Sequence, residues 1–203
     1  MAKKAPAGTP AITALSRARV THTVHTYEHD PGSQSYGLEA THALGVDPAR
    51  VFKTLIASVD GRLVVAVVSV TGSLDLKALA GAAGAKRAEL ADPVLAERTT
   101  GYVLGGISPL GQRKALPTII DASALDYPTV YVSGGRRGLE VELNPIDLVR
   151  LTAAATAPLG RLAVQPGTSG LLGCEGPAPP GGMETANSGA SPGLSRNCGS
   201  PCG

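Results

Sequence analysis

The pattern of apolar and polar positions divides most of the chain into short helices and strands. Helical spacing, with a proline in the first turn or a glycine after the last, predicts helices over residues 10–19, 38–44, 74–83, 93–99 and 145–151. Alternation and β-branched residues predict strands over residues 20–27, 51–59, 63–70, 102–104, 118–120, 129–132 and 139–143. Asp60-Gly61 is a strong hairpin signal between two of these strands. The mixture predicts an α+β fold rather than regular βαβ units.

This pattern stops after about Arg161. From Gln165 onward the chain consists mainly of Gly, Pro, Ser and Ala, which cannot bury enough surface to offset the entropy of ordering. We therefore expect one folded domain over residues 1–163 and a disordered tail over residues 164–203. The chain has three cysteines, all in this expected tail: Cys174, Cys198 and Cys202. The expected domain thus has no cysteine to act as a nucleophile.

Composition narrows the classes of function. One Phe, five Tyr and no Trp argue against RNA-binding modules that stack bases on exposed rings. The formal net charge is only +2, but basic pairs at residues 86–87, 113–114 and 136–137 can hold a few phosphates. The N-terminus lacks the apolar region of a secretory signal, and the longest aliphatic run, residues 63–68, is too short to span a membrane. We expect a cytoplasmic protein without membrane association.

Two glycine-rich segments stand beside basic residues: 105–111 (GGISPLG) and 133–138 (SGGRRG). Adjacent glycines permit positive φ angles or close approach of another backbone. Each segment could be an ordinary turn. Alternatively, the two could line one pocket with N–H donors and positive charge, suited to a phosphate, a carboxylate or a developing oxyanion.

Lys53 places a charge inside an apolar strand pattern. It is either on the exposed face of a half-buried strand or a cation in a cleft, where it would meet a phosphate or a polarised carbonyl. His25 and His29 are four residues apart, a spacing that suits zinc only on a helix, whereas here it falls in strand sequence. The P-loop and G-x-G-x-x-G patterns are missing from the sequence. We expect neither a metal nor a cofactor.

Five segments occur together in one order: 25–31 (HTYEHDP), 51–55 (VFKTL), 105–111 (GGISPLG), 117–121 (PTIID) and 132–139 (VSGGRRGL). In this combination the chain resembles the YbaK/EbsC family of trans-editing deacylases, in its Cys-tRNA(Pro)/Cys-tRNA(Cys) branch, over about residues 10–155. The resemblance implies a fold related to the editing domain of bacterial prolyl-tRNA synthetase, with a mixed, curved sheet and flanking helices. It also implies removal of cysteine from mischarged proline tRNA, in a transient complex with prolyl-tRNA synthetase.

The resemblance also suggests site residues. Lys53 matches the family's essential lysine, and Tyr27 matches a pocket tyrosine. Glu140 stands where well-studied members carry Asp, which keeps the charge but adds one methylene. The other expected substrate contacts are Tyr36 (often Phe in close relatives), Thr54, Gly105, Gly106, Ile107, Ser108, Ser133, Gly134 and Gly135.

The family is similar to this chain in lacking a protein nucleophile, and its mechanism is substrate-assisted. The thiol of the esterified cysteine attacks the ester and releases the tRNA, because a tethered thiol has a high effective concentration. Two alternatives stay open. The chain could be a binding module for an aminoacyl or nucleotide ligand without turnover, although Lys53 favours catalysis. It could also belong to the alanine-specific branch, since a methyl-sized difference is worth only ~1–3 kcal/mol in a pocket.

Overall fold

The computed structural model describes residues 8–30, 32 and 36–162. The tail expected over residues 164–203, with the three cysteines, lies outside the described residues. The helical elements are α1 (Pro10–Arg17), α2 (Tyr36–Leu44), η1 (Pro48–Arg50), α3 (Leu76–Ala82), α4 (Pro93–Thr100), η2 (Ala122–Asp126) and α5 (Pro145–Thr152). The strands are β1 (His22–Thr26), β2 (Val51–Val59), β3 (Arg62–Ser69), β4 (Gly72–Leu74), β5 (Ala88–Leu90), β6 (Thr118–Asp121), β7 (Val130–Arg136), β8 (Leu139–Leu143), β9 (Ala155–Ala157) and β10 (Gly160–Leu162).

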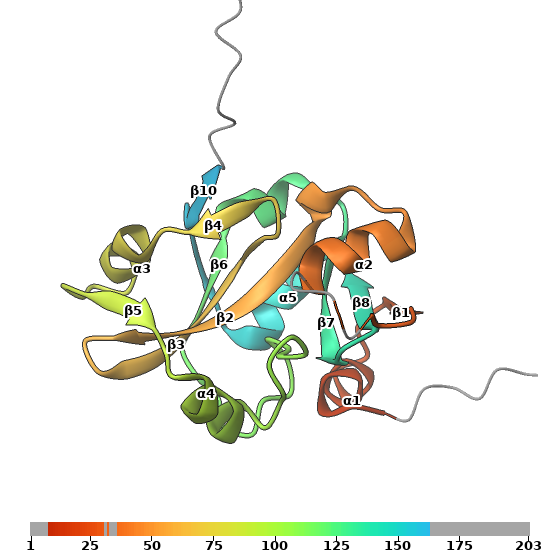
Figure 1. Ribbon diagram of the computed structural model, residues 1–203, viewed down its shortest axis with the longest axis horizontal. Helices are drawn as coiled ribbons and strands as arrows, with labels where there is room; N and C mark the ends of the chain where they lie inside the picture. The colour runs from red at the N-terminus through yellow and green to blue at the C-terminus, as the bar shows by residue number, and fades with distance from the viewer. Residues whose placement is uncertain (1–7, 31, 33–35, 163–203) are drawn as a thin grey trace, which may run out of the picture. The chain divides into compact units, whose positions relative to one another are not determined.

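Eight strands form one mixed sheet in the order β1-β8-β7-β2-β3-β6-β9, with β5 added beside β2 (Figure 1). The pairs β2–β7, β3–β6 and β6–β9 are parallel, and the others are antiparallel. β4 and β10 form a separate two-stranded sheet. The hairpin predicted at Asp60-Gly61 is confirmed, and both residues have the positive φ angles that such a turn needs.

The central strand β3 is buried on both faces, as expected for a strand in the middle of a covered sheet. On one face, Val65 and Val67 belong to the cluster that also holds Leu15 of α1 and Leu148 of α5. On the other face, Val64, Ala66 and Val68 share a cluster with Leu79 of α3. Helices therefore cover both sides, and the predicted α+β fold with a mixed sheet is confirmed.

Side-chain caps explain where three of the helices begin. Thr9, Asp92 and Asn144 each accept a hydrogen bond from a backbone N–H in the first turn of α1, α4 or α5. Each cap is followed by a proline, whose missing N–H is tolerated at that position. The sequence therefore locates these starts well, because the signal is local.

Two predictions of local structure are wrong. Residues 102–104 form no strand: Tyr102 is buried instead, and its hydroxyl donates to the Leu110 carbonyl at 2.7 Å, so it anchors the following loop. The second glycine-rich segment is largely a strand, because β7 continues to Arg136 with a register shift between Ser133 and Arg136. The predictions also missed four strands, each only three residues long: β4, β5, β9 and β10.

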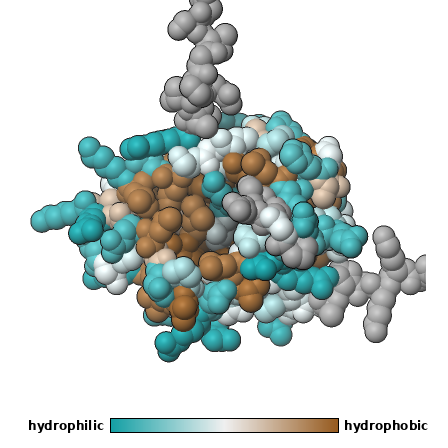
Figure 2. All heavy atoms as spheres, in the orientation of Figure 1, coloured by the Kyte–Doolittle hydropathy of each residue, from teal (hydrophilic) through white to brown (hydrophobic). Residues whose placement is uncertain are grey.

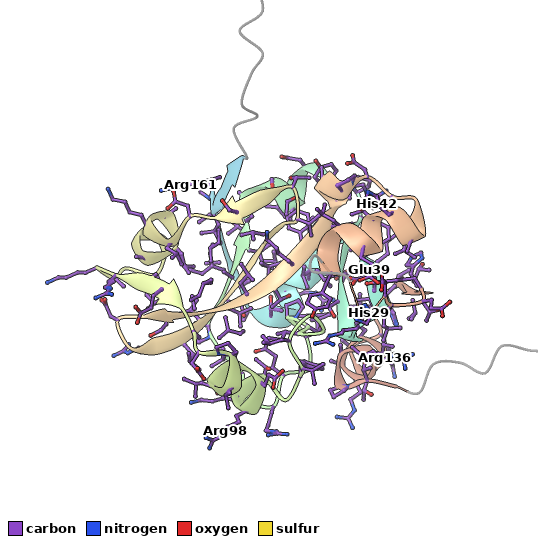
Figure 3. All side chains as sticks on the ribbon, in the orientation of Figure 1. His29, Glu39, His42, Arg98, Arg136 and Arg161 are labelled. Atoms are coloured by element: carbon purple, nitrogen blue, oxygen red, sulfur yellow. The ribbon has the colours of Figure 1, made fainter. Side chains whose placement is uncertain are left out.

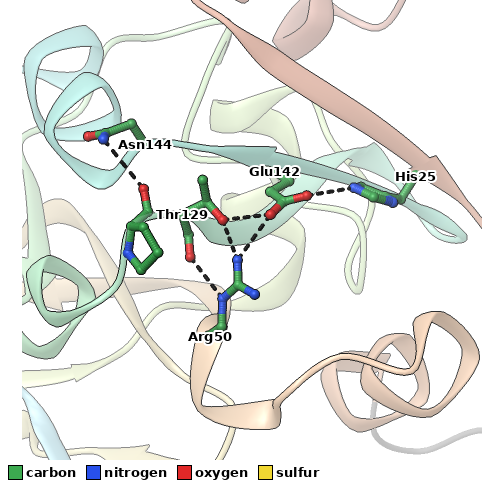
Figure 4. Close-up of polar contacts among 6 residues, drawn as sticks. His25, Arg50, Thr129, Glu142 and Asn144 are labelled. Carbon is green, nitrogen blue, oxygen red and sulfur yellow. Dashed lines mark hydrogen bonds and ion pairs between the residues drawn. The ribbon is translucent and has the colours of Figure 1, made fainter.

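A polar network ties the outer strands together (Figure 4). Glu142 of β8 accepts hydrogen bonds from Arg50 at 3.0 Å and from Thr129 at 2.6 Å, and it pairs with His25 at 3.1 Å. Although burial favours the neutral acid, hydrogen bonds with Thr129, His25 and Tyr131 hold the pKa of Glu142 below its usual value.

Among the described residues, no helix is both long and apolar enough to cross a membrane.

Candidate active site

A cavity of about 330 Å³ lies beside β2, where this strand loses its neighbour. β2 pairs with β7 only at Val51 and Phe52, and with β5 only from Ala57 onward. The backbone between these positions has no partner strand on that edge, apart from the Ile56 carbonyl, which accepts the Ala91 N–H at 2.9 Å. The sheet thus opens between β2 and β7, and the cavity occupies the opening.

The cavity brings together residues that are far apart in the sequence. Six of the predicted site residues line it: Tyr36, Lys53, Thr54, Gly105, Ile107 and Glu140. The other lining residues are Gly37, Val51, Phe52, Leu55 and Leu104. One lining residue, Leu104, is an apolar side chain that is 38% exposed. The space-filling view shows apolar side chains gathered on the face that carries β2 and α4 (Figure 2).

Lys53 projects from β2, and its Nζ donates to the Gly72 carbonyl at 2.6 Å. Because the side chain is half-buried, its pKa is lowered. An ammonium group has three N–H donors, so one bond to Gly72 leaves two for a ligand. The carbonyl therefore fixes the direction of the lysine without using all of its donors.

The strand that holds Lys53 in place is itself held by the C-terminal part of the domain. Gly72 of β4 pairs with Leu162 of β10. The Asp121 carboxylate accepts the N–H groups of Leu159 at 2.7 Å and of Gly160. Burial opposes ionisation of Asp121, but the hydrogen bonds from Ser123, Leu159 and Gly160 lower its pKa. Asp121 thus fixes β10 and, through β10, the position of Gly72.

Thr54 has three polar groups available at the cavity: its hydroxyl, its backbone N–H and its backbone carbonyl. Its Oγ1 is buried and has no hydrogen-bond partner among the described residues. The Val70 N–H donates to the Val51 carbonyl, so odd-numbered residues of β2 direct their backbone groups toward β3. The N–H and carbonyl of Thr54 therefore point to the open edge. A buried donor or acceptor without a partner costs free energy, which a bound ligand can recover.

Glu140 contributes a carboxyl group that is buried at the cavity wall. Burial raises its pKa to about 8, so the group is mostly neutral at pH 7 and can donate a hydrogen bond. Burial, together with the negative charges of Glu140 and Glu39, raises the pKa of Tyr27 to about 12. Tyr27 does not line the cavity, but it is close enough to Glu140 to be influenced by its charge.

The first glycine-rich segment forms one wall. Gly105 has a φ of +78°, and a Cβ there would lie 2.7 Å from the Tyr36 ring. Arg137 also packs on the Tyr36 ring, with its Cζ 4.9 Å from the ring centroid. Its Nε also donates to the Leu104 carbonyl at 3.0 Å. Gly105 is therefore required both for its backbone angle and for the space that Tyr36 occupies.

The other residues predicted to contact the substrate lie outside the cavity lining and pack against other parts of the protein. A Cβ on Gly106 would lie 2.8 Å from the Arg136 Cα, one on Gly134 2.8 Å from Leu139, and one on Gly135 2.7 Å from Tyr102. The hydroxyls of Ser108 and Ser133 accept N–H groups two residues ahead, from Leu110 and Gly135. For these five residues and Tyr27, a role in substrate binding stays a prediction.

The cavity also contains residues that the sequence reasoning did not select. Val51, Phe52 and Leu55 flank Lys53 within the 51–55 segment, so the same motif could have indicated them. Leu104 directly precedes the double glycine. No sequence pattern indicated Gly37. A Cβ at this position would lie 2.3 Å from Cγ1 of Val70, so the need for glycine arises from the packing of α2.

The histidines of β1 and of the segment that follows it point to separate partners. His25 pairs with Glu142, whereas Nδ1 of His29 lies 3.0 Å from both oxygens of Glu39. Figure 3 shows His29 and Glu39 side by side near α2. Over the described part of the chain, no group of three His, Cys, Asp or Glu residues could hold a metal ion.

Comparison with known proteins gives one consistent result. Residues 33–151 match the family model of the aminoacyl-tRNA editing domain. A candidate Cys-tRNA(Pro)/Cys-tRNA(Cys) deacylase, EbsC of Enterococcus faecalis, is 42% identical over 112 residues, which span 54% of this chain and 68% of EbsC.

Solved structures agree with this match. A candidate trans-editing enzyme for prolyl-tRNA synthetase is 25% identical with a TM-score of 0.66, over 78% of this chain and 99% of that one. A hypothetical protein is 25% identical with a TM-score of 0.68, over 75% of this chain and all (100%) of that one. The fold that surrounds the cavity is thus shared over nearly the whole length of both structures, and this chain belongs to the aminoacyl-tRNA editing domain family.

Proposed function

We propose that this protein is an aminoacyl-tRNA deacylase that removes cysteine from mischarged proline tRNA in trans. The observation that carries the proposal is the cavity beside the open edge of β2, which holds a half-buried lysine and a buried carboxyl group. Membership of the editing family supports tRNA as the substrate. The name of the 42% identical relative supports cysteine as the amino acid.

The cavity supports a reaction in which the substrate provides the nucleophile. Its described lining contains no cysteine, serine or histidine. In our proposal the sulfur of the esterified cysteine attacks its own carbonyl carbon and loses its proton. The bond from that carbon to the ribose oxygen breaks, and the departing oxygen takes up a proton. The products are free tRNA and a cyclic thiolactone.

Three groups of this chain would assist that step. Lys53 has two N–H donors left for the carbonyl oxygen, where negative charge develops. The backbone N–H of Thr54 points to the same opening and adds a second donor. Glu140, neutral at pH 7, can donate a hydrogen bond to the substrate's polar groups. Donors fixed before the reaction need no rearrangement in the transition state, which is the basis of their effect on the rate.

Selection of proline tRNA would depend partly on a partner. Three basic pairs can neutralise only a few phosphates, so we expect modest and salt-sensitive binding of tRNA by the isolated protein. We therefore propose a transient complex with prolyl-tRNA synthetase. The name of the trans-editing structure supports this partner. Since aminoacyl-tRNA is made and used in the cytoplasm, we place the activity there.

The proposal is tested by the deacylation rates of proline tRNA charged with cysteine, alanine or serine. We expect cysteine to be removed fastest, and the triple variant with Cys174, Cys198 and Cys202 changed to Ser to be as active as the wild type. A substrate whose cysteine is S-methylated should bind and remain uncleaved. Cleavage of this substrate at the usual rate would make water the nucleophile. Fastest removal of alanine, or binding without cleavage, would support the alternative functions instead.

A further inference from the structure

Arg137 lies at the mouth of the cavity and bridges two of its walls. Its Nε donates to the carbonyl of Leu104 at 3.0 Å, and its guanidinium covers the ring of Tyr36 with Cζ 4.9 Å from the centroid. Leu104 and Tyr36 both line the cavity, one from the loop after α4 and one from the start of α2. The guanidinium is therefore held at a fixed place beside the opening.

Arg137 keeps donors that can reach a ligand. A guanidinium has five N–H groups, and the bond to Leu104 uses only the one on Nε. The residue is exposed, and no carboxylate among the described residues forms an ion pair with it. Its planar fork suits the bidentate binding of a phosphate or carboxylate. A positioned cation with spare donors thus faces solvent at the entrance.

The chemistry of the substrate places a phosphate at the same entrance. This step rests on the proposed function: the ester that enters the cavity is attached to the terminal ribose of the tRNA. The phosphate on the 5′ side of that nucleoside is joined to the ester through the ribose alone, so it must lie near the mouth. We propose that Arg137 binds this phosphate and thereby selects amino-acid esters carried by a nucleotide over other amino-acid esters.

Two small esters test this inference: the 3′-cysteinyl ester of adenosine 5′-monophosphate and the 3′-cysteinyl ester of adenosine, which lacks the phosphate. We expect Arg137→Ala to lower kcat/KM for the phosphorylated ester by at least ~10-fold, the effect of a lost charge-assisted hydrogen bond. On the adenosine ester the same variant should lose clearly less, because only the packing of Arg137 on Tyr36 and Leu104 is missing there. Arg137→Lys should recover part of the loss, because it keeps the charge without the fork.

Arg136→Ala is the matched control, since it removes the same charge from the neighbouring exposed residue, which Figure 3 shows near α1. It should leave the preference for the phosphorylated ester unchanged. With Cys-tRNA(Pro), Arg137→Ala should reduce the slope of log kcat/KM against log salt by roughly 0.7–0.9, the value for one lost phosphate contact.

The outcomes separate the two proposals. Equal losses of Arg137→Ala on both esters would show a structural role and overturn the inference, while the deacylase function would stand. Equal effects of Arg136→Ala and Arg137→Ala would also overturn it, because only general electrostatic attraction would remain. If the wild type cleaved neither Cys-tRNA(Pro) nor either small ester, the proposed function would fail first, and the inference about Arg137 with it.

Discussion

Two cavities of the described core differ in what their polar groups do. The larger, about 570 Å³, lies between the tip of the β2–β3 hairpin and the end of α3. There the Asp60 carboxylate accepts the N–H groups of Lys86 at 3.0 Å and Arg87 at 3.1 Å. The Thr118 hydroxyl donates to the Leu116 carbonyl at 3.1 Å. These polar groups already have partners within the protein.

The smaller of the two cavities, about 330 Å³, has polar groups that are still available to a ligand. Thr54 has a buried hydroxyl without a partner in the described structure, Glu140 is a buried acid with a raised pKa, and Lys53 has spare donors. Such groups reduce stability unless a ligand satisfies them, so they are retained where a ligand is used. The difference teaches that the two criteria disagree: groups available to a ligand favour the smaller cavity, the site that we propose, whereas volume alone would favour the larger one.

The largest effect should come from the lysine. Lys53→Ala removes the cation from the smaller cavity, and we expect kcat on Cys-tRNA(Pro) to fall ~10²–10³-fold, as for loss of a group that stabilises an oxyanion. The circular dichroism spectrum should stay native, because the side chain is only half-buried and contributes little to the core.

The matched variant in the larger cavity is Arg62→Ala, which removes an exposed cation from its lining. It should leave kcat unchanged. A fully active Lys53→Ala variant, or a comparable loss in Arg62→Ala, would remove the functional difference between the cavities.

A smaller effect is expected from a methyl group on the cavity wall. Gly105→Ala places a Cβ 2.7 Å from the Tyr36 ring, so the wall must shift, and we expect kcat/KM to fall ~10-fold or more because misplacement of site groups is costly. Gly84→Ala is the control: its φ is +66° against +78° at Gly105, it lines the larger cavity, and its Cβ would meet nothing within 4 Å.

Thermal unfolding should show a loss of ~1–2 kcal/mol in both variants, since both place alanine at a positive φ. Gly105→Ala should lose somewhat more stability, because its Cβ also meets the Tyr36 ring. Only Gly105→Ala should lose activity. Equal activities of the two variants would show that the wall around Tyr36 does not shape the site.

Lys53 and the two glycine-rich segments also show what the sequence can and cannot predict here. Lys53 could be selected because a charge interrupts an apolar strand, and its family motif agrees. The two glycine-rich segments look alike in sequence, yet only the first lines the cavity. The second continues β7 through a register shift and packs on Leu139 and Tyr102. Which contacts a glycine makes depends on tertiary packing, which local sequence does not contain.

The same limit explains the fold. The helices with a capping residue and proline, and the hairpin at Asp60-Gly61, are encoded within a few residues and were predicted. The strands β4 and β10 have three residues each and exist because they pair with one another across the sequence. The opening between β2 and β7 likewise depends on which residues of β2 pair with β7 and β5, and a local motif does not encode this pairing.

A moderate effect that depends on pH is expected from Glu140. Its folded pKa of about 8 exceeds the ordinary value of 4.5, so the folded state binds more protons than the unfolded state between these values. Stability from this group is therefore complete below about pH 4.5 and is lost as the pH rises through about 8. Activity that needs the neutral acid should decline over the upper part of the same range.

Glu140→Gln keeps a donor that cannot ionise, so it should remove both losses. The measurements are denaturant unfolding and kcat at pH 5 to 9, with wild type and variant compared. An increase of wild-type kcat through pH 8, abolished in Glu140→Gln, would instead identify the ionised carboxylate as a base.

The smallest effect is expected from the end of the chain, and it tests whether the smaller cavity depends on anything beyond the described core. Deleting residues 164–203 should change neither the thermal midpoint nor the deacylation rate, because that composition cannot bury much surface and the cut leaves β10 whole. A cut after residue 157 removes Leu159 and Gly160, which Asp121 holds, and the β4–β10 pairing that positions Gly72 under Lys53. The longer deletion should therefore lower kcat, and the shorter should not. A large loss of stability or rate after the shorter deletion would mean that residues 164–203 belong to the working domain.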